Sequence, residues 1–195
     1  RITGTLSGHK PEGGSITTTI NAKAQDAAWE GLKGKKGAVV ALDYTTGAVL
    51  AMASSPSYNP NDLASHHLKD TTQAWKDLVA DPSSPLSNRA TRETYPPGST
   101  FKLVTAAAAL QNGYNPNSKV DSPENWILPG TRTPLTNETN CGGSKVTLTH
   151  ALDISCNTAF GKLGVALGQD KVRDQADRFG FGKAVGSDLS SAVSR

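Results

Sequence analysis

The sequence predicts a mixed α/β fold of the α+β type, with an antiparallel sheet flanked by helices and a mainly helical part. Two apolar stretches, Ala38–Leu42 and Ala48–Ala53, surround the turn Tyr44–Gly47, which indicates an antiparallel hairpin with both faces buried. The alanine-rich stretch after Ser99 is apolar on nearly every side and stops at Asn112–Gly113, as expected for a buried helix. The 195 residues suit one domain or slightly more.

Further elements are expected around the hairpin. Ser15–Ile20 is β-branched and predicts a short strand, and Asn21–Leu32 has the apolar spacing of an amphipathic helix. The inward-facing residues of that helix are expected to be Ala24, Ala27, Ala28 and Trp29. Between Leu63 and Ala80 we expect one or two short helices, with Trp75 and Leu78 packed inward.

The second half of the chain begins with a long irregular segment. Residues 115–144 are rich in Pro, Gly, Asn and Thr, which predicts a loop, and a loop of this length is usually functional or disordered. Helical patterns follow at Thr147–Ile154 and Thr158–Leu167.

Composition gives no sign of a nucleic-acid or metal-binding protein. The net charge of +3 comes without a basic stripe, so no nucleic acid is expected as a partner. No apolar run approaches the ~20 residues that span a bilayer. His66 and His67 are adjacent and would point apart on regular structure, so we expect neither a metal site nor a cofactor.

Ser99 and Lys102 are the first candidates for chemistry. They lie three residues apart at the start of the apolar helix, so they share one helix face. Serine is a weak nucleophile that needs a neighbouring base, and a lysine can be that base when apolar surroundings lower its pKa. Gly98 leaves room beside the serine for a substrate. The pattern predicts an acyl-transfer site in which Lys102 is neutral before reaction.

The Ser-x-x-Lys pattern alone is common by chance. A second copy, Ser7–Lys10, contains Gly8, precedes Pro11 and has no apolar helix after it, so we interpret it as a loop. On this pattern alone the simpler interpretation is that Ser99 caps an ordinary core helix and that Lys102 extends to water.

Ser155-Cys156-Asn157, between the two later helical stretches, favours the catalytic interpretation. Ser-x-x-Lys followed by Ser-x-Asn is the signature of penicillin-binding proteins and class A β-lactamases. A second hydroxyl can pass a proton between the lysine and a leaving group, and an amide can hold both the lysine and a peptide carbonyl. Ser-x-Asn also occurs at Ser57–Asn59 in a proline-flanked loop, and helix capping is the alternative role for Ser155 and Asn157.

A wider resemblance rests on several stretches that stand in order along the chain. They are residues 37–43, 46–54, 88–90, 95–102, 155–160 and 179–182. With them the chain closely resembles the transpeptidase domain of class B, monofunctional high-molecular-weight penicillin-binding proteins, from about Gly14 to about Gly182. The resemblance implies a penicillin-binding protein/β-lactamase-like transpeptidase fold. Residues 1–14 would be the tail of a preceding pedestal region or linker, and residues 15–195 the N-terminal portion of the transpeptidase domain.

The third motif of this family, Lys-Thr-Gly on a sheet strand, is absent. Lys162-Leu163-Gly164 has a similar outline but lies in a helical pattern, so it is not a substitute. We therefore expect only the front part of the domain, with the remaining strands supplied by a second chain or lost. Residues 1–195 alone are then expected neither to unfold cooperatively nor to react with penicillin at a useful rate.

The resemblance implies a serine D,D-transpeptidase. In that scheme Ser99 attacks the penultimate D-alanine carbonyl of a peptidoglycan stem peptide, expels the terminal D-alanine and passes the acyl group to an amine of a neighbouring stem. Lys102 would be the general base, Ser155 would relay the proton, and Asn157 would hold Lys102 and the substrate amide. The backbone N–H of Ser99 would form half of an oxyanion hole. Ser99, Ser155 and Asn157 would also contact a bound β-lactam.

The resemblance also implies where the protein acts and with what. Its members work at the extracytoplasmic face of the bacterial cytoplasmic membrane, held by an N-terminal anchor that would precede Arg1. The implied partners are peptidoglycan stem peptides, β-lactam antibiotics, a membrane glycosyltransferase and other cell-wall and division proteins.

Two other functions stay open on sequence alone. A class A β-lactamase needs a deacylating Glu in a loop after Ser-x-Asn, and no Glu follows Glu138 in this chain. A non-catalytic β-lactam sensor or cell-wall-binding module would be trapped covalently by the drug without turning over peptide.

Cys141 and Cys156 are the chain's two cysteines, and Cys156 lies inside the second motif. An even count in an extracytoplasmic protein favours a disulfide, which would close a loop of about 15 residues and contribute ~3 kcal/mol in the chain-entropy model. The alternative is that Cys156 merely fills a small apolar site.

Overall fold

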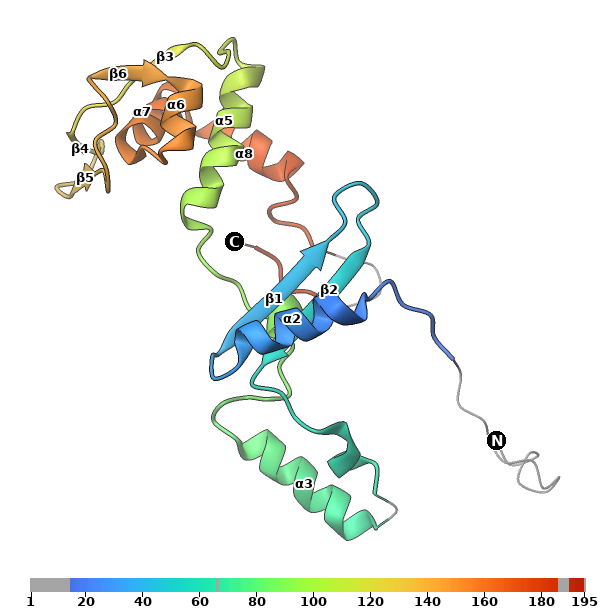
Figure 1. Cartoon of the computed structure of the whole chain (residues 1–195). Helices are drawn as coiled ribbons and strands as arrows, with labels where there is room; N and C mark the ends of the chain where they lie inside the picture. Colours follow the sequence, from blue (N-terminus) through green and yellow to red (C-terminus); the bar gives the residue numbers. More distant parts are fainter. Residues whose placement is uncertain (1–14, 66, 186–189, 195) are drawn as a thin grey trace. The chain divides into compact units, whose positions relative to one another are not determined.

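The computed structural model describes residues 15–65, 67–185 and 190–194, and it divides the chain between Glu93 and Thr94 into two compact units (Figure 1). The predicted tail or linker, residues 1–14, lies outside the described residues. Both helices and strands are present, which confirms the mixed fold class. Among the described residues, no helix combines the length and the apolarity needed to cross a membrane.

The first unit is built on the predicted hairpin. Strands β1 (Gly37–Leu42) and β2 (Val49–Ser55) pair antiparallel, with Val39 opposite Ala53 and Ala41 opposite Ala51. The preceding helix α2 (Ala22–Leu32) begins after Asn21, whose side chain accepts a hydrogen bond from the Ala24 N–H. An N-terminal cap of this kind stabilises a helix by about 1 kcal/mol. The predictions of the hairpin and of this helix are confirmed.

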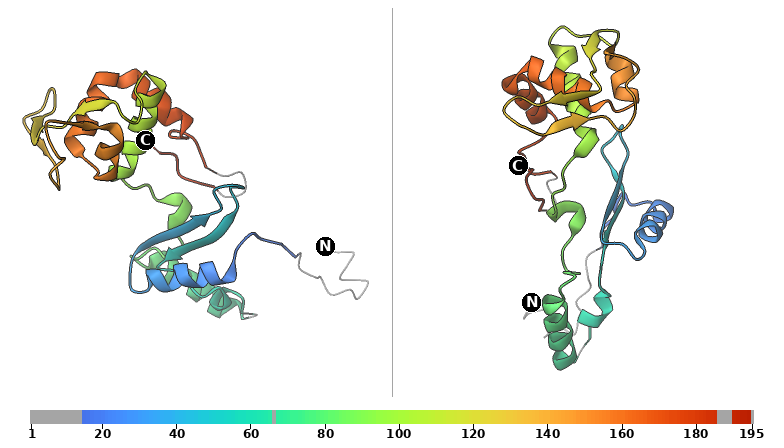
Figure 2. Two further views of the ribbon diagram at one scale, coloured as in Figure 1. Left: turned by 45° about the horizontal axis from the view of Figure 1, so that its top comes forward. Right: turned by 90° about the vertical axis from the view of Figure 1, so that its left-hand side faces the viewer.

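Helix α2 lies along one face of the hairpin (Figure 2). Ala28 and Leu32 of the helix form a small buried cluster with Ala51 and Ala53 of β2. Gln25 adds a polar contact, because its side-chain amide donates to the Met52 carbonyl at 2.9 Å and accepts from the Met52 N–H at 2.8 Å. Because the side chains of Ala28, Ala51 and Ala53 are small, the helix backbone approaches the strand closely.

Several burial predictions for this unit are wrong. The hairpin is not buried on both faces, since Val40 is 42% exposed and Leu42 is 58% exposed. Ala27 and Trp29 of α2 are also exposed, because the contact face of the helix is centred on Ala28 and Leu32. Among the described residues α2 covers one side of the hairpin only, which explains why Val40 and Leu42 are partly exposed.

Two other local predictions fare differently. Residues 15–20 form no strand; instead the Thr19 hydroxyl donates to the Val49 carbonyl and the Asn21 N–H donates to the Leu50 carbonyl. The predicted range Leu63–Ala80 contains one helix, α3 (Leu68–Ala80), which confirms that prediction, and the 3₁₀ helix η1 (Pro60–Leu63) ends where this range begins. Trp75 of α3, however, is 52% exposed rather than packed inward.

Arg89 organises the loops that follow β2. It begins the short helix α4 (Arg89–Arg92) and is 1% exposed. Its guanidinium donates hydrogen bonds to backbone carbonyls of four residues: Pro56, Ser83, Ser84 and Ser87. Its Nε lies 3.1 Å from Glu93 Oε1 without hydrogen-bond geometry, so that contact is electrostatic. A planar group with five N–H donors suits this ring of acceptors.

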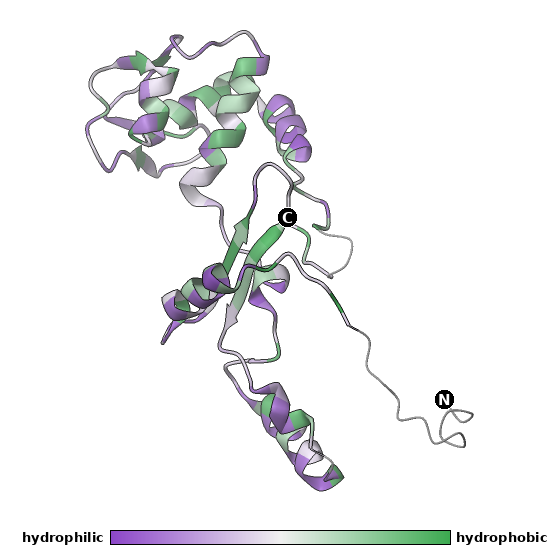
Figure 3. Cartoon of the chain, turned by 45° about the vertical axis from the view of Figure 1, so that its right-hand side comes forward, coloured by the Kyte–Doolittle hydropathy of each residue, from purple (hydrophilic) through white to green (hydrophobic). Residues whose placement is uncertain are grey.

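The second unit is mainly helical. Helix η2 (Gly98–Phe101) leads directly into α5 (Lys102–Gln111), followed by α6 (Leu148–Asp153), α7 (Asn157–Leu167) and α8 (Gln169–Arg178). Its buried core is formed by Ala106, Ala108, Ala109, Val120, Cys141, Val146, Leu148, Ala151, Cys156, Ala159, Phe160, Leu163 and Leu167. Figure 3 shows hydrophobic residues gathered in this part, whereas α8 is largely hydrophilic.

The predicted core helix after Ser99 is confirmed, but it is not buried on every side. Val104, Ala108 and Ala109 are buried, while Leu103 is 53% exposed and Leu110 is 48% exposed. The described residues thus cover α5 incompletely.

The segment predicted as a long loop, residues 115–144, contains three short strands, and a fourth follows it directly. They are β3 (Lys119–Asp121), β4 (Asn125–Ile127), β5 (Pro134–Thr136) and β6 (Lys145–Thr147). Strand β3 pairs with β6 and β4 pairs with β5, both antiparallel. The prediction of an irregular segment is wrong because a strand of three residues is too short to show an alternating pattern.

We expect Arg89→Lys to destabilise the full-length protein by about 3 kcal/mol, because one ammonium cannot satisfy the carbonyls that the buried guanidinium binds. The measurement is the shift in the midpoint of chemical unfolding. Arg132→Lys, at another exposed position, is the control and should change the midpoint little. Equal shifts for the two variants would contradict this role of Arg89.

Candidate active site

Ser99 and Lys102 lie where η2 passes into α5. Gly98 has φ +56°, in the left-handed region that favours glycine, and it turns the chain into the first helical residues. The spacing of three residues then brings Ser99 Oγ to 3.3 Å from Lys102 Nζ. Ser99 is exposed and Lys102 is half-buried, so a ligand can reach the hydroxyl while the amine is partly shielded from water.

Ser155 occupies a strained position at the end of α6. The Cys156 N–H donates to the Ala151 carbonyl at 2.8 Å and the Ser155 N–H donates to the Leu152 carbonyl at 3.0 Å. This pair of bonds is a Schellman motif, whose left-handed residue is usually glycine. Ser155 holds that place with φ +57°. A side chain there costs about 1 kcal/mol, so the hydroxyl is retained against a local preference for glycine.

The Lys102 amine brings the two motifs together. Its Nζ lies 2.6 Å from the Ser155 carbonyl oxygen, 2.7 Å from Ser155 Oγ and 2.6 Å from Asn157 Oδ1. The two hydroxyl oxygens, Ser155 Oγ and Ser99 Oγ, are 3.0 Å apart. All four residues predicted for the site therefore meet around one nitrogen.

The oxygens around Lys102 match the hydrogen-bonding capacity of a neutral amine. The Ser155 carbonyl and Asn157 Oδ1 can only accept, so they take the two N–H bonds of a neutral amine. Because the Ser155 hydroxyl donates to Ser99 Oγ, the lone pair of the amine is left for the Ser99 hydroxyl, 3.3 Å away. This arrangement lets Lys102 remove a proton from Ser99 directly.

Burial lowers the pKa of Lys102 from its ordinary value of 10.5, because desolvation disfavours the ammonium form. The ring of the buried Phe160 lies 6.0 Å from the amine and forms part of these apolar surroundings. The carboxylate of Glu138 acts in the opposite direction and raises the same pKa. The lowering is the larger effect, so the neutral form of Lys102 is reached at lower pH than for a free lysine.

Asn157 is the first residue of α7, and its amide is fixed from both ends. Its Nδ2 donates to the Thr136 carbonyl at 3.0 Å, while its Oδ1 accepts from Lys102. The first contact decides which end of the amide faces the lysine, because a carbonyl can bind only the NH₂ group. Thr136, at the end of β5, thereby becomes part of the site.

The two cysteines are linked by a disulfide, with a Cα–Cα distance of 5.8 Å between Cys141 and Cys156. Both residues are buried, at 4% and 1% exposure. The bond attaches the 137–144 segment to the residue between Ser155 and Asn157. It therefore restrains the backbone that carries both groups.

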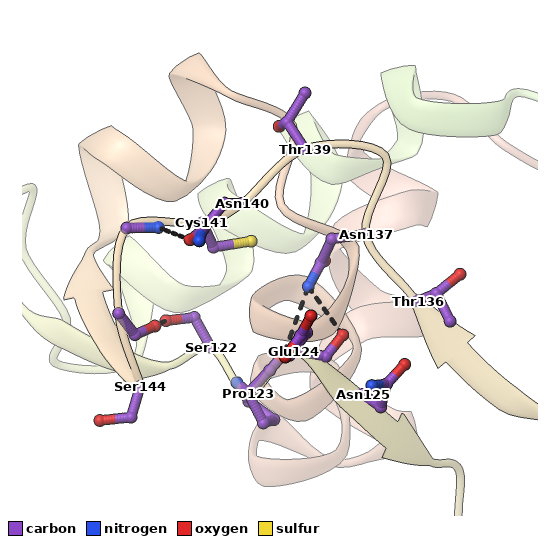
Figure 4. A pocket seen from close by; sticks show the side chains of 12 residues that line it. Ser122, Pro123, Glu124, Asn125, Thr136, Asn137, Thr139, Asn140, Cys141 and Ser144 are labelled. Atoms are coloured by element: carbon purple, nitrogen blue, oxygen red, sulfur yellow. Dashed lines mark hydrogen bonds between the residues drawn. The ribbon is translucent and has the colours of Figure 1, made fainter.

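A polar cavity of about 750 Å³ adjoins the disulfide, between residues 122–125 and 136–144 (Figure 4). Asn137 lies on its wall, and its Nδ2 is within hydrogen-bond distance of the Pro123 and Glu124 carbonyls, at 3.2 and 3.3 Å. Sequence reasoning did not identify Thr136, Asn137 or Glu138 as contributors to the site. They belong to no recognisable motif, and Thr136 acts through its backbone.

Comparison with known proteins gives a consistent family assignment. Residues 37–194 match the model of the penicillin binding protein transpeptidase domain. The chain is 46% identical over 189 residues to peptidoglycan D,D-transpeptidase PbpA of Mycolicibacterium smegmatis, covering 93% of this chain and 38% of that protein. It is 34% identical to peptidoglycan D,D-transpeptidase MrdA of Escherichia coli, covering 91% of this chain and 28% of that protein. The chain thus spans less than two fifths of the length of these relatives.

Solved structures agree with this assignment. Penicillin-binding protein A from M. tuberculosis, determined as its penicillin G acyl-enzyme complex, superposes with a TM-score of 0.86 at 44% identity, covering 99% of this chain and 46% of that one. PBP2 of Pseudomonas aeruginosa superposes with a TM-score of 0.76 at 38% identity, covering 91% of this chain and 40% of that one. The predicted fold family is therefore confirmed.

The rate of Ser99 acylation by a labelled penicillin should rise with pH as Lys102 loses its proton, with a midpoint below 10.5. Glu138→Gln should move that midpoint to lower pH, because it removes the charge that stabilises the ammonium form. The measurement is the pH profile of the labelling rate in the full-length protein. Glu124→Gln, an exposed carboxylate nearby that does not act on Lys102, is the control. A midpoint that does not move in Glu138→Gln, or moves equally in both variants, contradicts the assignment.

Proposed function

This chain belongs to the penicillin-binding protein transpeptidase domain family, and from that premise we propose that it is part of a serine D,D-transpeptidase that cross-links peptidoglycan stem peptides. The observation that carries the proposal is the position of Lys102 Nζ within 3.3 Å of oxygens of Ser99, Ser155 and Asn157. A nucleophile, a base, a second hydroxyl and an orienting amide are the groups that acyl transfer requires.

In the proposed acylation step, Ser99 Oγ attacks the carbonyl carbon of the penultimate D-alanine. Its proton passes to the lone pair of Lys102, and the carbonyl oxygen becomes an oxyanion. The backbone N–H of Ser99 is one proposed donor to that oxyanion. When the C–N bond breaks, the proton moves from Lys102 through Ser155 to the departing amine. The products are an ester on Ser99 and free D-alanine.

The second half-reaction reverses these proton transfers. The amine of a neighbouring stem peptide attacks the ester carbonyl and loses a proton to Lys102, directly or through Ser155. Collapse of the intermediate returns a proton to Ser99 and leaves a new amide bond between the two stems. Asn157 would donate its remaining amide hydrogen to the peptide backbone of the donor while its Oδ1 holds Lys102.

β-Lactams would acylate Ser99 by the same first step. The opened ring stays attached to the acyl group, so the ester persists where a peptide would be released. The penicillin G acyl-enzyme complex of a relative that is 44% identical supports this reactivity.

We also propose the domain boundaries, the location and the partners of the full protein, by analogy with the same family. We place residues 15–195 in the N-terminal portion of a transpeptidase domain, preceded by a pedestal tail or linker at residues 1–14. The protein would act at the extracytoplasmic face of the bacterial cytoplasmic membrane. A membrane glycosyltransferase and other cell-wall and division proteins are its proposed partners.

Ser99→Ala in the full-length protein should abolish labelling by a fluorescent penicillin, because it removes the exposed hydroxyl, 3.3 Å from Lys102 Nζ, that is the proposed nucleophile. Mass spectrometry of the wild-type adduct should locate the label on Ser99. Ser7→Ala, in the other Ser-x-x-Lys sequence, is the control and should label normally. An adduct on Ser7, or labelling that survives in Ser99→Ala, would sink the assignment.

Lys102→Arg should reduce the labelling rate by at least about a hundredfold, since general-base catalysis contributes 10²–10⁴ and arginine stays protonated at any working pH. The charge is kept, so the loss reports the missing base rather than the missing cation. A variant that reacts at the wild-type rate would show that the base is another group.

A further inference from the structure

The orientation of Asn157 depends on a hairpin that is distant in sequence. The acceptor for its Nδ2 is the Thr136 carbonyl, at the last residue of β5, 3.0 Å away. Strand β5 pairs with β4, with Trp126 opposite Leu135. Any displacement of this hairpin along α7 therefore moves the oxygen that sets the direction of the Asn157 amide.

Asn137 attaches the end of the hairpin to the start of α7. Its Oδ1 accepts from the Thr158 N–H at 3.0 Å, and its Nδ2 lies 3.0 Å from Thr158 Oγ1. Thr158 is fully buried, and its hydroxyl donates to the Pro123 carbonyl at 2.7 Å. A satisfied polar network of this kind is rigid, because every broken bond leaves a buried group unpaired.

The hairpin rests on α7 at a residue that has no side chain. A Cβ added to Gly161 would lie 2.8 Å from Leu135 Cδ2 and 3.0 Å from Trp126 Cζ3, so both side chains of the facing pair touch the helix backbone there. Gly164, one turn later in the same helix, has no atom within 4 Å of the corresponding position. Glycine in a helix interior is about 1 kcal/mol less favourable than alanine. The close contact with the hairpin explains why a glycine is present at position 161 despite this cost.

Gly161 and Asn157 are four residues apart, so they lie on the same face of α7. The hairpin therefore contacts α7 at two places on this face, through Leu135 and Trp126 at Gly161 and through Thr136 at Asn157. A larger residue at 161 would push the hairpin away from the helix and lengthen the bond from Thr136 to Asn157. The amide would then lose the partner that points its oxygen at Lys102.

We propose that Gly161 is a positioning residue for acylation: it seats the β4–β5 hairpin so that the Thr136 carbonyl holds Asn157 toward Lys102. The proposal rests on the proposed function, since it assigns Gly161 a part in the reaction of Ser99. It gives the hairpin a role in the reaction even though its own side chains do not contact Lys102 or Ser99.

The test compares Gly161→Ala with Gly164→Ala in the full-length protein. Both changes add one methyl group to the same helix, so their effects on helix propensity are matched. The readouts are the rate of labelling by a fluorescent penicillin and the final fraction of molecules labelled. Gly161→Ala should slow labelling about tenfold or more while the final fraction stays complete, because small displacements of a catalytic group have large effects on rate. Gly164→Ala should label at the wild-type rate.

A rescue variant separates positioning from simple loss of structure. Leu135→Ala removes the atom nearest the new methyl group, so the double variant Gly161→Ala/Leu135→Ala should recover most of the lost rate. Equal rates for Gly161→Ala and Gly164→Ala overturn the proposal. A reduced labelled fraction at an unchanged rate, or failure of the rescue, also overturns it. A wild-type protein that is not acylated at Ser99 would instead refute the proposed function itself, and the positioning role with it.

Discussion

The contact between the Lys102 amine and the segment Ser155–Asn157 is the constraint that the helix packing of the second unit satisfies. It joins side chains 53 and 55 residues apart with distances of 2.6–2.7 Å, so the helices that carry them must be held closely. Small buried residues make this possible: Ala109 of α5, Ala151 of α6 and Ala159 of α7 are at most 1% exposed. Alanines at helix contacts bring backbones together, and close packing then resists the movement of one helix against another. The hydrophobic core thereby sets the geometry of a polar site.

The same contact requires a turn that the backbone does not favour. Ser155 presents both its carbonyl and its hydroxyl to Lys102 only because it stands in the left-handed position of the Schellman motif. Glycine would relieve the strain of about 1 kcal/mol but would remove the hydroxyl. The neighbouring disulfide offsets this cost, since closing a loop of about 15 residues contributes ~3 kcal/mol by restricting the unfolded chain. In that model the stabilisation comes from the unfolded chain, and in the folded chain the bond restrains the backbone that carries Ser155 and Asn157.

How far the sequence predicts this structure depends on the length and kind of each signal. The β1–β2 hairpin, α2, α5 and α7 are predicted because each has a long apolar pattern. The strands β3 to β6 are missed because three residues show no period, and the exposure of Trp29 and Trp75 is missed because an apolar side chain does not reveal what covers it. The side chains around Lys102 could be predicted because they belong to motifs of fixed spacing. The Thr136 carbonyl could not be predicted, because every residue has a carbonyl and only the fold decides which one faces Asn157.

The electrostatics of Lys102 connect the site to its ligand. The Glu138 carboxylate favours the ammonium form of Lys102, and burial is the larger, opposing effect that lowers its pKa. Burial is incomplete while Ser99 and Ser155 are exposed to water. Under the proposed function, a peptide or β-lactam bound over Ser99 would remove that water and add to the desolvation of the amine. The neutral lysine would then be favoured further when an acyl donor is in place to react.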